Sequence, residues 1–166
     1  NEKFWECVAA WNEWKAEHDV VFHRTEITVW NDPEEGLGYA GTFDLMMEVD
    51  GKLYLVDIKT SRGLYSSTWM QLAALYSAKH LLELGPDGKD QMIEGWQLPI
   101  EGVAVLHVRP SDTTWDGKPM APFCKWVELP TEKDKTFLDS VALFLRGLMS
   151  LRTYAEAARE WKGRSK

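Results

Sequence analysis

The pattern of apolar and polar positions along the first third of the chain predicts a helix followed by strands. Residues 4–15 carry apolar side chains at helical spacing. Residues 20–30 are rich in β-branched and aromatic side chains, which is typical of a strand, and the breaker at residues 31–33 ends this run. Two further strand-like runs flank Asp50 and Gly51, the dipeptide that favours a two-residue type I′ turn. The pattern therefore predicts a β-hairpin at this point.

The rest of the chain predicts two more helices and two more strands. The spacing indicates a helix over residues 68–84, strands over 102–109 and 125–129, and a third helix over 131–151. The third helix begins with a capping-box variant and keeps one apolar stripe of Phe137, Val141, Phe144, Leu148 and Leu151. The order α-β-β-β-α-β-β-α predicts an α/β (α+β) fold with a mixed central sheet flanked by helices.

Composition is that of one ordinary globular domain. The chain has 166 residues, of which 45% are hydrophobic and 27% charged, so we expect a single domain over residues 1–166, which leaves open a longer parent chain. No apolar run is long enough to cross a membrane, and we expect a cytoplasmic protein without a membrane partner. The net charge of −7 argues against a broad basic surface, so any contact with DNA must be local.

The predicted hairpin fixes which side chains share a face. A two-residue loop makes Val49 face Lys52, and counting outward places Asp44 directly opposite Asp57. Lys59 points to the same face as Asp57 because side chains alternate along a strand. The opposite face of the hairpin is largely apolar and suited to packing under a helix.

Two carboxylates placed in this way indicate a cation site. Their Cβ atoms would lie roughly 5 Å apart, where like charges are destabilising. A hard divalent cation removes this repulsion, since Mg²⁺ takes one or two carboxylates, here Asp44 and Asp57, and accepts a backbone carbonyl such as that of Ile58. The Lys59 ammonium would then orient an attacking water and stabilise charge that grows on a phosphoryl group.

The alternative interpretation is that both aspartates lie on a solvated hairpin face, with Lys59 as an ordinary salt-bridge partner. The same face also carries the apolar side chains Met46, Leu53 and Leu55. A face with these apolar side chains is expected to be buried under another element. Partly buried acids then need a partner that compensates their charge. We therefore prefer the cation site.

The run "GTFDLMMEVDGKLYLVDIKTS" resembles the core of the PD-(D/E)XK nucleases, in particular their RecB-like and phage-exonuclease branch. That pattern is Gly-x-x-Asp, a hairpin, Asp-x-Lys-Thr, and a following helix with a glutamine. The matching positions are Gly41, Asp44, Asp57, Lys59, Thr60 and, within "QLAALYSA", Gln71. The resemblance covers about residues 20–82, and it implies a restriction-endonuclease-like core.

The resemblance also implies an activity, which is hydrolysis of DNA phosphodiesters with Mg²⁺ or Mn²⁺ in DNA recombination, repair or processing. It favours an exonuclease, while an endonuclease and an inactive DNA-binding or protein-docking module remain alternatives. Only two cysteines are present, so the chain cannot hold the four-cysteine iron–sulfur cluster of some relatives and is closer to the cluster-free phage recombination enzymes. The expected partner is DNA, in a bacterial or phage-infected cell, with a homo-oligomer or a recombination protein left open.

Four further residues are candidates for the site. Glu26 resembles the upstream acid of the family, which helps to hold the metal or its water, although it can also be read as an edge-strand surface acid. Gln71 corresponds to a glutamine that points toward the active centre and the DNA, whereas a lone helical glutamine is usually solvated. Arg62 is a candidate phosphate contact, and Trp69, beside Gln71, is a candidate for base stacking.

The remaining candidates favour structural interpretations. His107 and Arg109 share one side of a strand end and, with Arg62 and Lys118, could meet phosphates, although a lone strand-end histidine is more often structural. Leu75 stands where family members often have a tyrosine, so Tyr76 is expected in the core rather than in the site. Helical spacing predicts that three tryptophans pack against the core, namely Trp5, Trp11 and Trp14.

Overall fold

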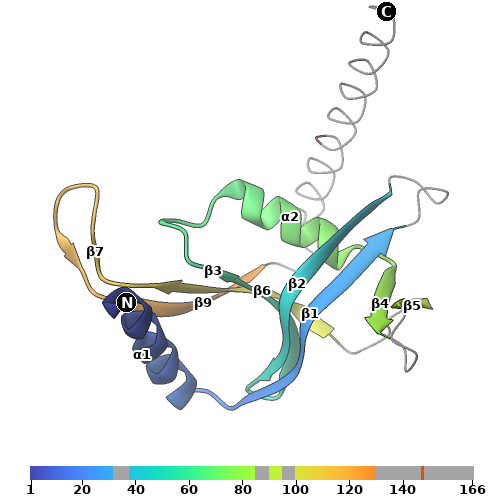
Figure 1. Cartoon of the computed structure of the whole chain (residues 1–166), viewed down its shortest axis with the longest axis horizontal. Coiled ribbons are helices and arrows are strands. Elements are labelled where there is room, and N and C mark those ends of the chain that lie inside the picture. Colours follow the sequence, from blue (N-terminus) through green and yellow to red (C-terminus); the bar gives the residue numbers. More distant parts are fainter. Residues whose placement is uncertain (32–37, 85–89, 95–99, 130–146, 148–166) are drawn as a thin grey trace, which may run out of the picture.

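The computed structural model describes residues 1–31, 38–84, 90–94, 100–129 and 147. They form two helices and nine strands, which are α1 (Glu2–Ala16), β1 (Val20–Asn31), β2 (Tyr39–Val49), β3 (Lys52–Lys59), α2 (Ser66–Tyr76), β4 (His80–Leu84), β5 (Asp90–Glu94), β6 (Ile100–Arg109), β7 (Asp112–Thr113), β8 (Pro119–Met120) and β9 (Phe123–Leu129). Seven of the strands make one mixed sheet in the order β5-β4-β1-β2-β3-β6-β9, in which β3 and β6 run parallel. The described part of the chain is thus a mixed α/β fold, with α1 and α2 packed on the sheet (Figure 1).

The β2–β3 hairpin has the predicted turn and register. Asp50 and Gly51 both have positive φ values, 51° and 80°, which is the conformation of a type I′ turn. Val49 pairs with Lys52, and the regular pairing continues outward to Leu45 opposite Val56. A further contact supports the turn, because Asp50 accepts a hydrogen bond from the Asp19 backbone N–H at 2.9 Å and pairs with His18.

One face of the sheet packs under α1. Trp14 is 8% exposed and lies in a cluster with sheet side chains of β2, β3 and β6: Met47, Val49, Tyr54, Val56, Ala104, Leu106 and Val108. The predicted packing of a helix on this face is confirmed. Trp11 also borders the cluster, but the prediction for Trp5 is wrong, since its side chain is 65% exposed. The nine positions between Trp5 and Trp14 turn the helix by about 180°, so the two rings point to opposite sides.

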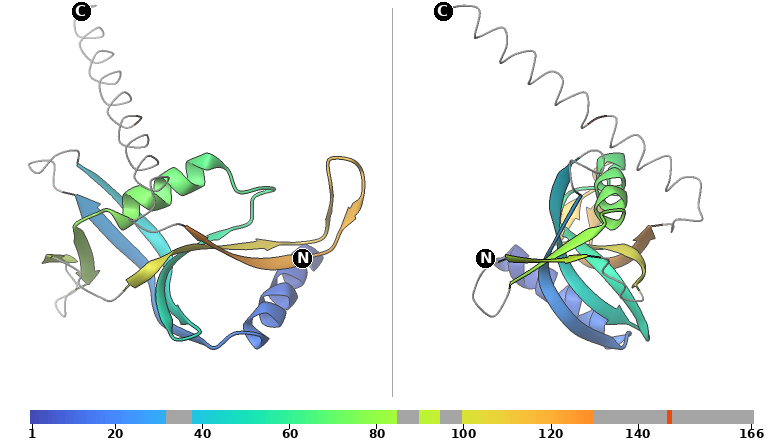
Figure 2. Two further views of the ribbon diagram at one scale, coloured as in Figure 1. Left: turned by 180° about the vertical axis from the view of Figure 1, so that it is seen from behind. Right: turned by 90° about the vertical axis from the view of Figure 1, so that its right-hand side faces the viewer.

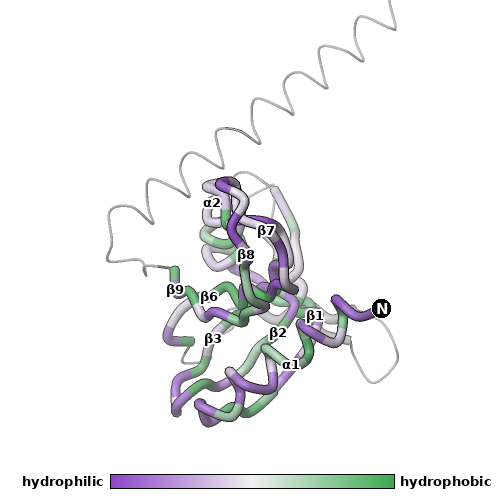
Figure 3. The backbone as a smooth tube through the Cα atoms, turned by 90° about the vertical axis from the view of Figure 1, so that its left-hand side faces the viewer, coloured by the Kyte–Doolittle hydropathy of each residue, from purple (hydrophilic) through white to green (hydrophobic). Residues whose placement is uncertain are grey.

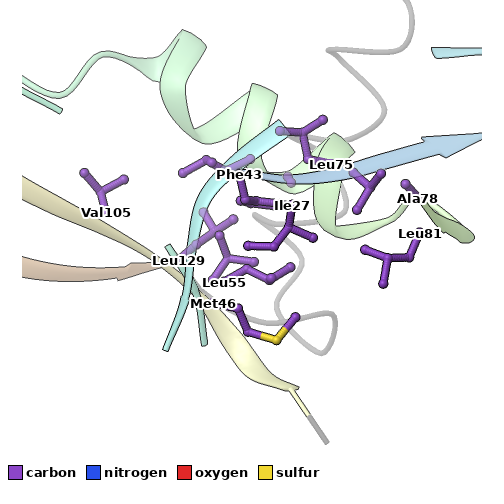
Figure 4. Packing of buried hydrophobic residues seen from close by; sticks show 13 residues of the cluster. Ile27, Phe43, Met46, Leu55, Leu75, Ala78, Leu81, Val105 and Leu129 are labelled. Atoms are coloured by element: carbon purple, nitrogen blue, oxygen red, sulfur yellow. The ribbon is translucent and has the colours of Figure 1, made fainter. Parts of the chain in front are cut away.

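The other face packs under α2. Leu72 and Leu75 of the helix are buried in one cluster with Phe43, Met46 and Leu55 of the hairpin strands. Figure 4 shows Leu75 beside Phe43 in this cluster. Tyr76 borders this cluster, as predicted. Hydrophobic stretches of the tube in Figure 3 follow the central strands between the two helices. The hairpin is therefore buried on both faces at its centre.

Gly41 allows α2 to approach β2 closely. A Cβ atom built on Gly41 would lie 2.3 Å from Cδ2 of Leu75, well inside van der Waals contact. Nearby, the Tyr39 hydroxyl donates a hydrogen bond to the Ala74 carbonyl at 2.6 Å. The glycine of the Gly-x-x-Asp motif thus has a packing role three residues before Asp44.

The second helix is shorter than predicted. It ends at Tyr76, and His80–Leu84 forms strand β4, which pairs antiparallel with β1. The leucines at 81, 82 and 84 fit either periodicity, and the open edge of β1 supplies hydrogen-bond partners that a helix would not use. Asn31 assists by accepting the Lys79 backbone N–H at 2.9 Å. Strand β5, which pairs with β4, was not predicted either.

The predicted strands over 102–109 and 125–129 correspond to β6 and β9. Between them, β7 and β8 form a short hairpin that projects from the end of the sheet near the N-terminus of α1 (Figures 1 and 2). The predicted third helix, at 131–151, falls outside the described residues apart from position 147. Among the described residues no helix has the length and apolar character needed to cross a membrane.

Candidate active site

The regular pairing of β2 and β3 stops just before the first motif aspartate. The last paired residues are Leu45 and Val56, and a continued register would pair Phe43 with Ile58. Instead, the carboxylate of Asp44 accepts the backbone N–H of Ile58 at 2.6 Å, measured from Oδ2 to N. A side chain has therefore replaced a strand-to-strand hydrogen bond at this position.

An irregularity in β1 lies beside this break. Glu26 has a φ of 54°, a left-handed conformation that is uncommon for a residue other than glycine. It stands between the pairs Thr25–Leu45 and Ile27–Phe43, so it is the residue of β1 nearest in register to Asp44. The faces change here as well, because Phe43 and Met46 both belong to the cluster under α2 although an unbroken strand would point them to opposite faces. Such distortions change the direction of side chains and often occur next to active sites.

Asp57 is a buried acid whose carboxylate pairs with Lys59. Its residue exposure is 5%, and its side chain points to the α2 face because Leu55 does so two residues earlier. Lys59 Nζ lies 2.5 Å from Asp57 Oδ2 and forms an ion pair with it. Burial raises the pKa of Asp57, the Lys59 ammonium opposes this, and the charge on Asp44 adds to it.

The Ile58 backbone faces the break in the sheet. Its N–H points toward Asp44, and in a β-strand the carbonyl of a residue lies on the same side as its N–H. The Ile58 carbonyl is thus directed to the side where the pairing with β2 has ended. Asp44, Asp57 and this carbonyl are three oxygen-bearing groups at the place where the pairing of β2 and β3 ends.

These ligands suit a hard divalent cation. Mg²⁺ and Mn²⁺ prefer carboxylate and carbonyl oxygens, and Mg²⁺ commonly uses one or two carboxylates while it keeps several waters. Within the described ranges, no group of three His, Cys, Asp or Glu side chains is placed to hold a metal. Glu26 therefore does not join Asp44 and Asp57 in a single carboxylate cluster. The predicted role of Glu26 at the metal is supported only by its position in register with Asp44.

Helix α2 places the two other candidates differently. Gln71 is exposed on the helix, whereas its neighbours Leu72 to Leu75 are buried. Trp69 is half-buried and packs against the cluster under α2. This packing buries part of the Trp69 ring, so less of the ring is accessible to a base than the predicted stacking role requires.

The predicted phosphate-binding group at the end of β6 makes internal contacts. His107 is 8% exposed, and its Nε2 lies 2.8 Å from the Ser61 carbonyl. Arg109 is 5% exposed and donates a hydrogen bond to Asp112 at 2.5 Å. Lys118 is exposed but pairs with Asp116 at 2.6 Å. These contacts favour the structural interpretation for both buried residues.

Arg62 lies on the loop after β3 and approaches an aromatic ring that sequence reasoning missed. Its Nη2 donates to the Thr113 carbonyl at 3.3 Å, and its guanidinium carbon lies 5.0 Å from the ring centroid of Trp115. Trp115 is 91% exposed. A signal was present in the sequence, since a tryptophan directly before the turn dipeptide Asp116-Gly117 cannot be buried easily.

A cavity of about 320 Å³ lies on the opposite face of the sheet from Asp57. It is lined by apolar residues of α1, β1, β2, β3 and β6, namely Trp11, Phe22, Leu45, Ile58, Leu106 and Val108. The cavity contains no acid, base or nucleophile among these side chains. Asp57, whose side chain faces α2, therefore does not line this cavity.

Comparison of the chain with models of known protein families and with curated proteins finds no match to either. The function of the site is therefore inferred from the geometry of the described residues and from the resemblance of the Gly-x-x-Asp and Asp-x-Lys-Thr motifs.

Proposed function

We propose that this protein hydrolyses DNA phosphodiester bonds at a divalent-metal site held by Asp44, Asp57 and the Ile58 carbonyl, with Lys59 as the electrostatic group. The observation that carries the proposal is the state of Asp57. Asp57 is 5% exposed, and burial and the charge on Asp44 raise its pKa in spite of the ion pair with Lys59, so one ammonium does not offset the cost of burying this charge. A bound divalent cation would offset both the burial and the repulsion between the two acids.

The break between β2 and β3 supports the same proposal. Asp44 is fixed by the Ile58 N–H, so its second oxygen and the Ile58 carbonyl are positioned by the backbone of β3 rather than by a flexible loop. The left-handed Glu26 beside it is a local strain of the kind that concentrates at functional sites. A hairpin that carries both acids is what the proposed restriction-endonuclease-like core requires.

Each residue then has a defined task. When bound, Mg²⁺ or Mn²⁺ supplies a water of lowered pKa and neutralises the phosphate. Asp57 and Asp44 would hold the metal, and its positive charge would remove the repulsion between the two carboxylates. The Lys59 ammonium, 2.5 Å from Asp57, would turn to a phosphate oxygen or to the attacking water. Exonuclease action is the preferred form, on the resemblance to the phage and RecB-like branch.

The test is a cleavage assay with end-labelled linear DNA and closed circular DNA in Mg²⁺, Mn²⁺ or EDTA. We expect metal-dependent loss of the linear substrate, with the circle resistant if the enzyme is an exonuclease and cut if it is an endonuclease. Asp57→Ala should abolish cleavage while circular dichroism shows an intact fold. Activity of Asp57→Ala near that of the wild type, or no cleavage by the wild type with either metal, contradicts the proposal and leaves an inactive binding module.

A further inference from the structure

Trp115 occupies the tip of the projecting β7–β8 hairpin. At 91% exposure it is the most exposed large hydrophobic side chain among the described residues, where the others reach 65%. The Thr114 carbonyl accepts the Gly117 N–H at 3.0 Å, and Gly117 has a φ of 79°. This places Trp115 at the second position of a tight turn at the hairpin tip.

The hairpin that carries Trp115 is anchored firmly at its base. Glu6 of α1 accepts hydrogen bonds from the backbone N–H of Ser111 at 2.7 Å and from its hydroxyl. The next residue, Asp112, pairs with buried Arg109 at 2.5 Å and lies 3.6 Å from Nε of Arg62. An exposed aromatic ring on an anchored support loses little entropy when it binds a ligand.

Arg62 connects this support to the candidate active site. It is held by Asp112 and by the Thr113 carbonyl, and its guanidinium faces the Trp115 ring at 5.0 Å. Arg62 follows Lys59 by three positions in the chain, so their Cα atoms lie at most roughly 10 Å apart. Trp115 is therefore connected through Arg62 to the loop that directly follows Lys59.

We propose that Trp115, backed by Arg62, is a stacking platform for an unpaired base of the DNA strand that enters the Asp44–Asp57 site; this inference rests on the proposed function. The outer face of an indole stacks on any base, and a guanidinium against its inner face adds a cation–π contact while it keeps a positive charge near the backbone. The chain has a net charge of −7. Stacking would bind the DNA strand without the broad basic surface that phosphate contacts require. The preferred substrate would then have a single-stranded or frayed end.

The experiment uses the full chain in EDTA and a short single-stranded oligodeoxynucleotide with 2-aminopurine near one end, whose fluorescence falls on stacking. We expect the wild type to bind it and quench it. Trp115→Ala should weaken binding about tenfold or more and abolish the quenching, since one base–aromatic stack accounts for about that change. Trp115→Phe should keep part of both effects.

Trp5→Ala is the matched control, because Trp5 is 65% exposed on α1 and makes no contact with the hairpin in any described interaction. It should bind and quench as the wild type does. Equal affinity and quenching in Trp115→Ala and the wild type, or no binding by the wild type, overturns the platform. So does a change in oligomeric mass for Trp115→Ala without a change in oligonucleotide affinity, which would assign the ring to self-association.

The outcome also separates the two proposals. Binding that depends on Trp115 in a protein that cleaves nothing with Mg²⁺ or Mn²⁺ supports the platform and contradicts the proposed hydrolysis. Cleavage by the wild type together with unchanged oligonucleotide binding by Trp115→Ala contradicts the platform alone.

Discussion

The carboxylate of Asp44 accepts the backbone N–H of Ile58 at 2.6 Å, at the place where β2 leaves β3. This bond ties the first motif aspartate to the residue next to the second one. The two acids are therefore joined through the backbone of β3, and the charge on Asp44 contributes to the raised pKa of Asp57.

Lys59→Ala separates metal binding from chemistry. We expect the rate of DNA hydrolysis to fall by about 10²-fold or more, because a preorganised charge beside the reacting phosphate is lost. Metal-induced stabilisation should remain, since Lys59 is not a ligand. Lys52→Ala, at the exposed start of the same strand, is the control and should cleave normally. A collapse of metal affinity in Lys59→Ala, measured by calorimetry, would make the lysine structural.

Asp57→Asn should gain stability relative to the wild type as pH rises in the metal-free protein. Burial raises the folded-state pKa of Asp57 above its value in the unfolded chain. Its contribution to stability is therefore present below the unfolded-state pKa and is lost as pH rises through the folded-state pKa. The asparagine has no such loss. Urea denaturation in EDTA should show the difference between the two proteins growing in favour of Asp57→Asn from acidic to neutral pH.

For Asp50→Asn we expect the opposite dependence of stability on pH. Hydrogen bonds from His18 and from the Asp19 backbone lower the pKa of Asp50, so the wild type should gain over this variant as pH rises and lose that gain as pH falls through the folded-state pKa. Parallel pH profiles for Asp57→Asn and Asp50→Asn would show that burial does not destabilise the Asp57 charge.

Gly51→Ala tests the hairpin that sets the register. The φ of 80° at Gly51 is strained for any residue with a Cβ, and we expect a loss of about 1–2 kcal/mol in the free energy of unfolding. Gly63→Ala is the matched control, because a Cβ at Gly63 meets nothing within 4 Å and its φ is not in the left-handed range. Equal denaturation midpoints for the two variants would exclude a type I′ turn at Asp50-Gly51.

Gly41 and Leu75 should be energetically coupled. Gly41→Ala forces its Cβ against Leu75 and should cost about 1–3 kcal/mol, while Leu75→Ala alone should cost about 2–5 kcal/mol through a cavity. Because the new methyl group partly fills that cavity, the double variant should lose less than the sum, by about 1 kcal/mol. Strict additivity in urea denaturation would mean that α2 does not pack on Gly41 as described.

The local sequence pattern was sufficient for the hairpin and for the strands that carry the site. Asp50-Gly51 determines the turn, and the turn determines every pair out to Leu45 and Val56. The register of the hairpin could not predict the structure beyond Leu45 and Val56. The left-handed conformation of Glu26 and the hydrogen bond from Ile58 to Asp44 depend on β1, β2 and β3 together. Asp44 and Asp57 are therefore neighbours at a break in the sheet rather than a regular cross-strand pair.

Two other differences have tertiary causes. The leucines after Ala78 fit a helix as well as a strand, and the free edge of β1 decides for the strand. Trp69 and Trp115 cannot be ranked for stacking by sequence spacing, because only the packing of α2 and the tip of the β7–β8 hairpin show which ring is buried and which is exposed.

The most direct test of a shared cation is the melting temperature of the wild type, Asp44→Asn and Asp57→Asn with and without Mg²⁺ or Mn²⁺, with Asp50→Asn as the control acid on the same hairpin. At a metal concentration about 100 times the dissociation constant, mass action should raise the melting temperature of the wild type and of Asp50→Asn by about 5–10 °C. The increase should shrink strongly in both Asp44→Asn and Asp57→Asn. An equal increase in all four proteins would show that Asp44 and Asp57 do not hold a cation together, and it would contradict the proposed active site.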